Sequence, residues 1–424
     1  MNKTKEIWMS GFALFSLFFG AGNLILPPFL GMKSGADWWL VVLGFVLTAV
    51  TIPILAILAH AKLQGTLYDF GKKVSPTFSV IYCLLIYLIA VAIPSPRTAS
   101  VTHEMAIQPF FGTSSLLTST VYFLLVFIFA LNRSKIISLI GKFLTPIIVL
   151  ILLTIIFIAF FTAPETVNPS LFETPFVDGI LEGYQTFDAI GGVVVGAVII
   201  ISLHLRGHTT YEAKKELITK SGFIAGFGLL IIYGGLILSG SLFGSTFAEN
   251  ATRIEVLSGL SSQTLGNIGT AFLSVLVALA CFTTAVGIVT GTADYIKGML
   301  KDSQKAYIIT AALSSLIGII VGSYNVGFII DVAVPVLMFL YPITIVLILL
   351  NIVPDKFASK RVFRSVVLVT FVFSIPDFLQ FFVPADSLTG IQNFIPFSKF
   401  SLGWVLPAFL TFLSVNFTKK SNKN

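Results

Sequence analysis

Charged side chains are scarce in this sequence of 424 residues. Asp, Glu, Lys and Arg together make up 11% of it, against 56% hydrophobic residues. A soluble globular protein carries roughly 25% charged residues. Polar stretches long enough to form a soluble domain are also missing between the apolar ones. These shortages exclude an ordinary soluble protein and predict an all-α integral membrane protein.

Cysteine and histidine are also rare. The two cysteines, Cys83 and Cys281, both fall within apolar stretches, where a small buried hydrophobe is the simplest interpretation. The spacing of the cysteines offers neither a disulfide framework nor a metal site. The histidines lie near the ends of predicted spans, away from any cysteine or carboxylate cluster: His60, His103, His204 and His208. We therefore expect neither an enzyme nor a cofactor.

The apolar residues form twelve stretches, and about 20 such residues cross a bilayer core. The sequence therefore predicts twelve transmembrane helices. The stretches are 6–30, 38–60, 76–96, 115–131, 136–162, 179–203, 219–244, 266–293, 305–322, 327–351, 362–382 and 401–418.

The basic residues indicate the orientation of these helices. The net charge of +7 does not point to nucleic acid, because Lys and Arg gather on alternate loops and at both termini. Excess Lys and Arg mark cytoplasmic segments, so we expect both termini in the cytoplasm. Only four of the 26 basic residues fall on the opposite face: Lys33, Arg97, Arg253 and Lys399.

The first and sixth stretches are interrupted near their middles. Residues 19–23 read FGAGN, with Pro27 and Pro28 following, and residues 188–192 read DAIGG. Unpaired backbone groups in hydrocarbon cost several kcal/mol each, so such breaks survive only where they face protein or a wet cavity. Broken helices of this kind surround the binding site of secondary transporters. The breaks therefore predict a transporter with its site between these two helices.

A nucleotide-binding loop is missing from the sequence. The nearest approach to G-x-x-x-x-G-K-[ST] runs from Gly65 to Lys73, with one residue too many and no hydroxyl after the lysine. The energy for transport is therefore expected from an ion gradient, from the gradient of the substrate itself, or from a partner protein.

Several motifs resemble those of the branched-chain amino acid:cation symporters, the bacterial BrnQ-type carriers. The resemblance covers nearly the whole chain. The family usually has Met where this chain has Phe187, and the pair Ser95–Pro96 is additional here. The motifs are GAGNLILPP at 20–28, PRTA at 96–99, EGYQT at 182–186 and ACFTTA at 280–285.

The resemblance implies a fold in the amino acid/polyamine/organocation superfamily, of the bacterial leucine transporter type. This fold has two inverted repeats of five helices followed by two further helices, with helices 1 and 6 broken. Five spans per repeat is an odd number, so the second repeat enters the membrane from the opposite side. The expected units are residues 1–162, 163–351 and 352–424.

The resemblance also implies the activity: import of leucine, isoleucine and valine across a bacterial cell membrane by alternating access, coupled to Na⁺ or H⁺. A symporter for another neutral amino acid remains an alternative. A channel would also contain broken, wet helices, but it would lack saturable, accumulative uptake.

The resemblance implies a sodium site between the first and eighth helices. In this fold, the eighth helix provides one carbonyl and, three and four residues later, two hydroxyls. Positions i, i+3 and i+4 share one helix face, and these groups face carbonyls of the unwound first helix. Alternatively, the two threonines bond back to the preceding helical turn. The expected ligands are Ser16, Phe19, Ala280, Thr283 and Thr284.

The substrate is expected at the breaks. Free amides at the half-helix start after Gly20, those of Ala21 and Gly22, are suited to a carboxylate. Asn23 either binds an ion or orients the loop, and a helix cap is the simpler explanation.

An ionisable residue in mid-span, Asp188, suggests a functional role. It either pairs with the substrate ammonium, holds a cation, carries a proton, or is tied to nearby backbone amides. Phe187 is expected to close an apolar pocket, and Tyr87 to lend a hydroxyl to the carboxylate. For Arg97, beside Pro94 and Pro96, a gate and a charge at the outer membrane boundary both remain open.

Overall fold

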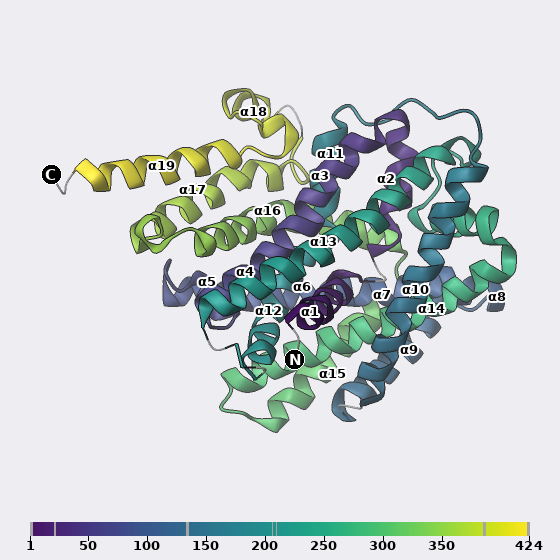
Figure 1. Ribbon diagram of the computed structural model, residues 1–424, viewed down its shortest axis with the longest axis horizontal. Coiled ribbons are helices and arrows are strands. Elements are labelled where there is room, and N and C mark those ends of the chain that lie inside the picture. Colours follow the sequence, from purple (N-terminus) through teal and green to yellow (C-terminus); the bar gives the residue numbers. More distant parts are fainter. Residues whose placement is uncertain are drawn as a thin grey trace.

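The computed structural model describes residues 3–20, 23–132, 135–205, 207–208, 210–384 and 387–421. Within these ranges every regular element is helical (Figure 1). Nine helical segments of the described chain are long and apolar enough to cross a membrane. The first, sixth and twelfth predicted spans correspond to broken or shorter helices, so twelve crossings stay a prediction.

The first part of the chain contains ten α-helices and three short turns of tighter or wider helix. They are α1 (Lys3–Phe18), α2 (Leu26–Ser34), η2 (Gly35–Asp37), α3 (Trp38–Val46), η3 (Leu47–Thr51), α4 (Ile52–Leu63), α5 (Leu67–Gly71), α6 (Pro76–Ala92), α7 (Pro94–Thr102), η4 (His103–Ile107), α8 (Gln108–Phe111), α9 (Ser115–Asn132) and α10 (Lys135–Thr162).

The remaining helices complete the bundle, and the last long ones lie together on one side of it (Figure 1). They are α11 (Pro175–Tyr184), α12 (Asp188–Leu205), α13 (Tyr211–Leu242), η5 (Gly244–Thr246), α14 (Arg253–Met299), α15 (Gln304–Val321), α16 (Val326–Ile352), η6 (Asp355–Phe357), α17 (Lys360–Leu379), α18 (Thr389–Phe394), η8 (Ser398–Phe400) and α19 (Val405–Ser421).

Polar residues start many of these helices. At α14, the Thr252 side chain accepts a hydrogen bond from the Glu255 amide, and the Glu255 carboxylate accepts one from the Thr252 amide. Such reciprocal capping satisfies two amides that the helix leaves without partners. Ser303, Asn325 and Ser359 cap α15, α16 and α17 in the simpler way, with one accepted bond each.

The long helix α14 bends at Gly266, whose φ of 70° lies in the left-handed region. Glycine adopts this conformation without the penalty that a Cβ would bring. The predicted eighth span begins at the same residue, so residues 253–265 form a separate helical arm before it.

The third span differs from its prediction of 76–96. Its helical path bends at Ile93 and continues through α7, η4 and α8 to Phe111. Pro94 and Pro96 do not end the span, because they sit in the first turn of α7, where the missing N–H groups have no helical partner to lose. This correction moves Arg97 from the outer boundary into the interior.

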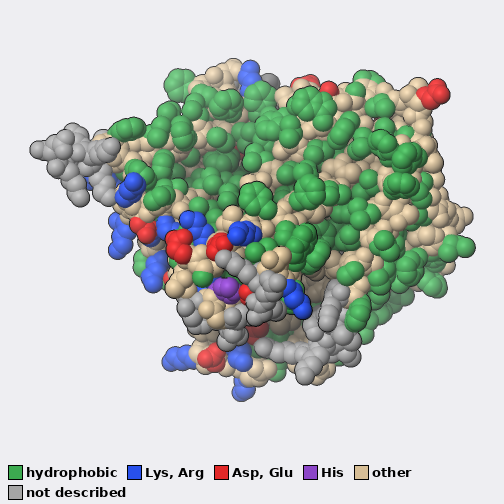
Figure 2. All heavy atoms as spheres, in the orientation of Figure 1, with side chains coloured by type: hydrophobic (Ala, Val, Ile, Leu, Met, Phe, Trp, Pro, Cys, Tyr) green, Lys and Arg blue, Asp and Glu red, His purple; other side chains and the backbone are tan. Residues whose placement is uncertain are grey.

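The surface agrees with a membrane protein. Figure 2 shows one broad face covered by hydrophobic side chains, while Lys, Arg, Asp and Glu gather mainly along one edge. Large exposed hydrophobic residues are spread over many of the long helices, as expected for a surface in contact with lipid tails.

Close helix contacts depend on small residues. α2 packs against α13 where Gly31 meets the backbone of Ile237 and Ser241, and where Gly240 meets the backbone of Pro28. A Cβ on Gly31 would lie 2.7 Å from the backbone nitrogen of Ser241, so only glycine allows this approach. Small residues at helix crossings are typical of membrane bundles.

Candidate substrate site at the two helix breaks

The break in the first span is confirmed. α1 ends at Phe18 and α2 begins at Leu26. Pro27 and Pro28, which the sequence marks as an interruption, start the second half-helix from its first turn.

The chain turns tightly between the two half-helices. The Gly20 amide donates to the carbonyl of Phe18 at 2.9 Å, and the Asn23 amide donates to the carbonyl of Gly20 at 2.9 Å. Ala21 and Gly22, the predicted carboxylate-binding positions, lie outside the described residues.

The break in the sixth span lies three residues before its predicted position of 188–192. α11 ends at Tyr184 and α12 begins at Asp188, so residues 185–187 form the break. Phe187 has a φ of 60°, which is rare for a bulky residue and characteristic of strained functional segments. Asp188 therefore starts a half-helix, where the helix dipole favours a negative charge.

Of the two glycines behind this break, Gly192 serves packing, whereas a Cβ on Gly191 would meet open space. Gly191 and Gly192 both lie within α12. A Cβ on Gly192 would lie 3.0 Å from the Cβ of Ala56 and from the carbonyl oxygen of Pro53, so the glycine lets α12 approach α4 closely. The sequence pattern of two glycines indicated a broken helix, whereas the requirement here is close contact.

The two breaks are joined by a buried chain of hydrogen bonds. Asn23 Nδ2 donates to Asp188 Oδ1 at 3.0 Å, and Arg97 Nη2 donates to Asn23 Oδ1 at 3.1 Å. Arg97 Nη1 also donates to the carbonyl of Gln185 at 2.8 Å. Arg97, Asn23 and Asp188 have relative exposures of 3%, 4% and 8%. We call this arrangement the Arg97–Asn23–Asp188 bridge.

The bridge corrects the interpretation of Arg97 as a boundary charge. Its guanidinium lies between the broken helices, 5.5 Å from the ring centroid of Phe187. Burial of a charge in a membrane interior is expensive unless the group is paired. Two oxygen acceptors and one aromatic face provide this compensation here.

Two polar atoms at the second break have no hydrogen-bond partner among the described residues. They are Asp188 Oδ2 and Gln185 Oε1, and both are buried. Buried polar groups in folded proteins are nearly always hydrogen-bonded. Unpartnered atoms at a helix break are therefore the expected mark of a ligand site.

Tyr87 lies in a different environment. Its ring stacks on Tyr295 of α14, with centroids 4.3 Å apart. The hydrogen bonds of the described residues do not join Tyr87 to Asn23 or Asp188. Its predicted contact with the substrate carboxylate stays a prediction.

The two hydroxyls among the predicted sodium ligands on α14 bond back along the helix. Thr283 Oγ1 and Thr284 Oγ1 donate to the carbonyl of Ala280, at 2.9 and 3.0 Å. This is the alternative that the sequence left open. A hydroxyl that donates its hydrogen keeps lone pairs for a cation, so the residues fit a sodium site.

The two predicted ligands in the first span, Ser16 and Phe19, differ in their burial. Ser16 is exposed, and its Oγ lies 3.1 Å from Thr145 Oγ1 of α10. Phe19 is buried, and its ring stacks on Phe15 with centroids 5.1 Å apart. The hydrogen bonds of the described chain do not join these residues to Ala280, and the complete site stays a prediction.

An ion pair lies one helical turn before the second break. Arg253 Nη2 of α14 lies 3.2 Å from Glu182 Oε1 of α11, and its guanidinium lies 4.5 Å from the ring centroid of Phe29 in α2. The half-helices α2 and α11 are thus tied together by Arg253.

A cavity of about 270 Å³ lies between α1, α12 and α13. It is separate from the bridge, and its lining is apolar except for two serines. The residues are Ser10, Ala13, Leu14, Leu17, Val195, Ile199, Leu203, Leu217, Ile218 and Ser221.

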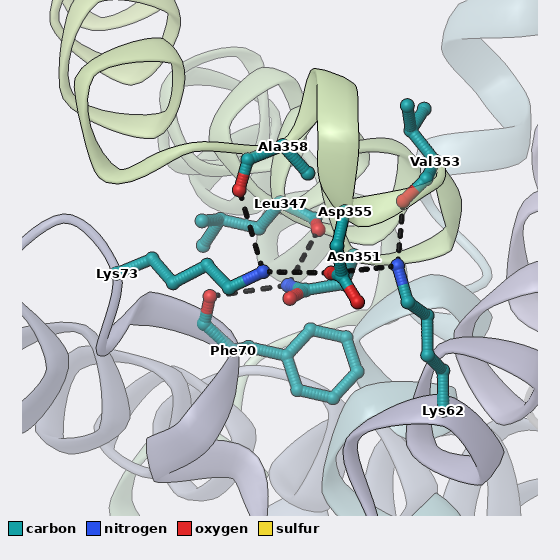
Figure 3. A network of polar contacts seen from close by, with 8 residues as sticks. All are labelled: Lys62, Phe70, Lys73, Leu347, Asn351, Val353, Asp355 and Ala358. Atoms are coloured by element: carbon teal, nitrogen blue, oxygen red, sulfur yellow. Dashed lines mark hydrogen bonds and ion pairs between the residues drawn. The ribbon is translucent and has the colours of Figure 1, made fainter.

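The C-terminal ends of α4 and α16 are joined by a second polar network, drawn in Figure 3. Asp355 Oδ1 lies 3.2 Å from Lys62 Nζ and 3.3 Å from Lys73 Nζ. Lys62 also donates to the carbonyl of Val353 at 2.6 Å. Asn351 donates to the carbonyl of Phe70 at 3.1 Å. We call Lys62, Lys73 and Asp355 the Lys–Asp clasp.

The fold is shared with solved membrane transporters. Mhp1, a nucleobase-cation-symport-1 family transporter, aligns in its closed conformation over 97% of this chain and 93% of its own, with 10% identity and a TM-score of 0.66. Its inward-facing conformation aligns over 97% and 91%, with 14% identity and a TM-score of 0.58. This likeness and the facing helix breaks define the class of fold: a multi-pass helical membrane protein with two broken spans.

The sequence places the chain within one transporter family. The family described as "Branched-chain amino acid transport protein" matches residues 3–422, and the chain belongs to it. The branched-chain amino acid permease BraB of Bacillus subtilis is 33% identical, over 95% of this chain and 93% of its own. A branched-chain amino acid transport system 2 carrier protein of Pseudomonas aeruginosa is also 33% identical, over 96% and 94%.

Proposed function

We propose that this protein is a secondary carrier that imports leucine, isoleucine and valine by alternating access, coupled to Na⁺. The observation that carries the proposal is the 3.0 Å hydrogen bond from Asn23 to Asp188, because it brings the breaks of the first and sixth spans together. The names of the relatives support the substrate class.

The proposed architecture has twelve crossings with both termini in the cytoplasm. Residues 1–162 and 163–351 form two inverted repeats of five helices, and residues 352–424 add two more. The corresponding positions of the breaks in α1–α2 and α11–α12 support this division.

The proposed substrate site uses both breaks. The amides of Ala21 and Gly22 are proposed to bind the carboxylate, and Asp188 is proposed to bind the ammonium. Phe187 borders the apolar side chain, and a pocket with few polar groups there would favour branched aliphatic residues.

The proposed coupling ion binds between α1 and α14, at the carbonyls of Ser16, Phe19 and Ala280 and the hydroxyls of Thr283 and Thr284. Oxygen ligands of this kind suit a hard cation. One cation moved through 100 mV supplies about 2.3 kcal/mol, enough to concentrate a solute roughly fiftyfold.

The proposal is tested by reconstituting the protein in liposomes and measuring leucine uptake with an imposed sodium gradient, an imposed proton gradient, or neither. Accumulation that requires sodium and is competed by isoleucine and valine is the expected result. Proton-driven accumulation would show that the coupling ion is H⁺ and not Na⁺. Preference for another neutral amino acid would show that the proposed substrate is wrong. Uptake that never exceeds equilibrium would indicate a channel and refute the carrier.

A further inference from the structure

We propose that the Arg97–Asn23–Asp188 bridge is a two-ended receptor for the zwitterionic head group of the substrate. Arg97 binds the carboxylate and Asp188 binds the ammonium, while Asn23 keeps the two charges apart. The inference rests on the proposed function and deepens it, because it assigns a charged carboxylate anchor on the third span.

The first step of the argument is the separation of the charges. Arg97 and Asp188 are buried and opposite in sign, yet Asn23 stands between them in the hydrogen-bond chain. Opposite charges in a low-dielectric interior attract strongly, and a direct pair would satisfy both. A neutral spacer leaves each charge able to accept a further partner.

The second step is the orientation of the spacer. The Asn23 oxygen accepts from Arg97, and the Asn23 nitrogen donates to Asp188. A reversed amide would place its N–H groups against the guanidinium and its oxygen against the carboxylate, which repels at both ends. The two charges thus fix Asn23 in one orientation.

The third step is the unused bonding capacity. A guanidinium has five N–H donors, and the hydrogen bonds of the described residues use two of those of Arg97. Asp188 Oδ2 is buried and has no partner among the described residues. The donors suit a carboxylate in a bidentate arrangement, and the acceptor suits an ammonium.

The fourth step is the match in length. From Arg97 to Asp188 the bridge consists of two hydrogen bonds and one amide group. An α-amino acid zwitterion with one charge-assisted hydrogen bond at each end has a comparable span. A zwitterion can therefore lie alongside Asn23 and engage both charges.

The guanidinium is also held in place before substrate arrives. Its Nη1 donates to the carbonyl of Gln185 at 2.8 Å, and its Cζ lies 5.5 Å from the ring centroid of Phe187. Both contacts come from the second break. Pre-organisation of this kind lowers the ordering cost of binding.

The test compares three probes in competition with labelled leucine: leucine itself, leucinamide without the carboxylate, and 4-methylpentanoate without the ammonium. In the wild type, both analogues should compete at least tenfold more weakly than leucine. Arg97→Gln should raise the concentration of leucine for half-maximal competition at least tenfold and leave that of leucinamide unchanged. Asp188→Asn should likewise raise the concentration of leucine for half-maximal competition at least tenfold and leave that of 4-methylpentanoate unchanged.

Control variants distinguish recognition from folding. Arg361→Gln removes an exposed positive charge from α17 and should leave all three affinities unchanged. If Arg97→Gln does not fold, Arg97→Lys keeps the charge but loses the planar fork, and should lower the leucine-to-leucinamide preference several-fold.

Each outcome separates the two proposals. If Arg97→Gln loses affinity for leucine and leucinamide by the same factor, or keeps its affinity for leucine, the inference is overturned. Leucine uptake by the wild type would still preserve the proposed function. Absence of wild-type leucine uptake would overturn the proposed function and the inference with it.

Discussion

At the scale of single residues, the chain places three polar side chains where a membrane protein can least accommodate them. Arg97, Asn23 and Asp188 come from three different spans, and each is nearly inaccessible to solvent. Their mutual hydrogen bonds offset part of the desolvation penalty. The arrangement is therefore sensitive to a change of a single atom.

Asn23→Asp tests this sensitivity. The substitution preserves shape but places a carboxylate against both Arg97 and Asp188, so it pairs with the first and repels the second. We expect the Michaelis constant for leucine to rise at least tenfold with little change in the thermal unfolding midpoint. The matched control is Asn267→Asp, at an exposed position of α14. Equal uptake by Asn23→Asp and wild type would contradict a role for the bridge.

The sequence predicted the polar residues at this site unevenly. Asn23 and Asp188 were recognisable, because each interrupts an apolar run at mid-span. Arg97 was misplaced, because two prolines beside it resemble the end of a helix. The run of polar and small residues after Pro96 could have shown that the helix continues, because it extends the helix as far as Thr102.

At the scale of helices, the proposed ion site depends on two elements that must come together. Thr283→Ala and Thr284→Ala should each raise the sodium concentration for half-maximal uptake at least tenfold, because each removes one oxygen ligand. Uptake measured against sodium concentration in proteoliposomes gives this value directly.

The control for the threonines is Thr154→Ala. Thr154 lies exposed on α10 and makes the same backward bond, to the carbonyl of Leu150 at 2.9 Å. It should behave as wild type. If the α14 variants match this control, the hydroxyls serve only their own helix.

Helix packing provides a second prediction at this scale. Gly31→Ala would bring a Cβ against the backbone of α13, and overpacking of this kind costs about 1–3 kcal/mol. The thermal unfolding midpoint in detergent should therefore fall. Gly298→Ala on α14 meets open space and should leave the midpoint equal or slightly higher. Equal midpoints for both variants would indicate that α2 and α13 separate easily.

The positions of most helices followed from hydrophobicity alone. The fourth, fifth and ninth spans start and end within a residue or two of their predictions. The breaks were less predictable, because a glycine pair such as Gly191–Gly192 serves either a bend or a close contact. Only the neighbouring helix, here α4, decides between them.

At the scale of the whole molecule, the Lys–Asp clasp connects the first part of the chain to its last third (Figure 3). Hydrogen bonds from Lys62 and Lys73 hold the pKa of Asp355 below its usual value of 3.8. A lowered carboxylate pKa stabilises the folded state above that value, and the benefit disappears as the pH falls through the folded-state pKa.

Asp355→Asn should therefore lower the unfolding midpoint at pH 7, by an amount equivalent to about 1 kcal/mol or less, because the carboxylate is largely exposed. The difference from wild type should shrink as the pH falls below about 3.8 and vanish below the folded-state pKa of Asp355. Unfolding midpoints measured from pH 7 to pH 3 give both values. Asp302→Asn, in an exposed turn, is the control. A difference that persists at low pH would mean that the clasp is not electrostatic.

The neutral spacer in the bridge has an electrical consequence. With Arg97 as a guanidinium and Asp188 as a carboxylate, the two groups cancel, and Asn23 keeps them in one dipole across the centre of the bundle. A zwitterion adds no net charge to this pair. Membrane voltage then acts on the coupling cation alone, and the return of the empty carrier should carry no current from these residues.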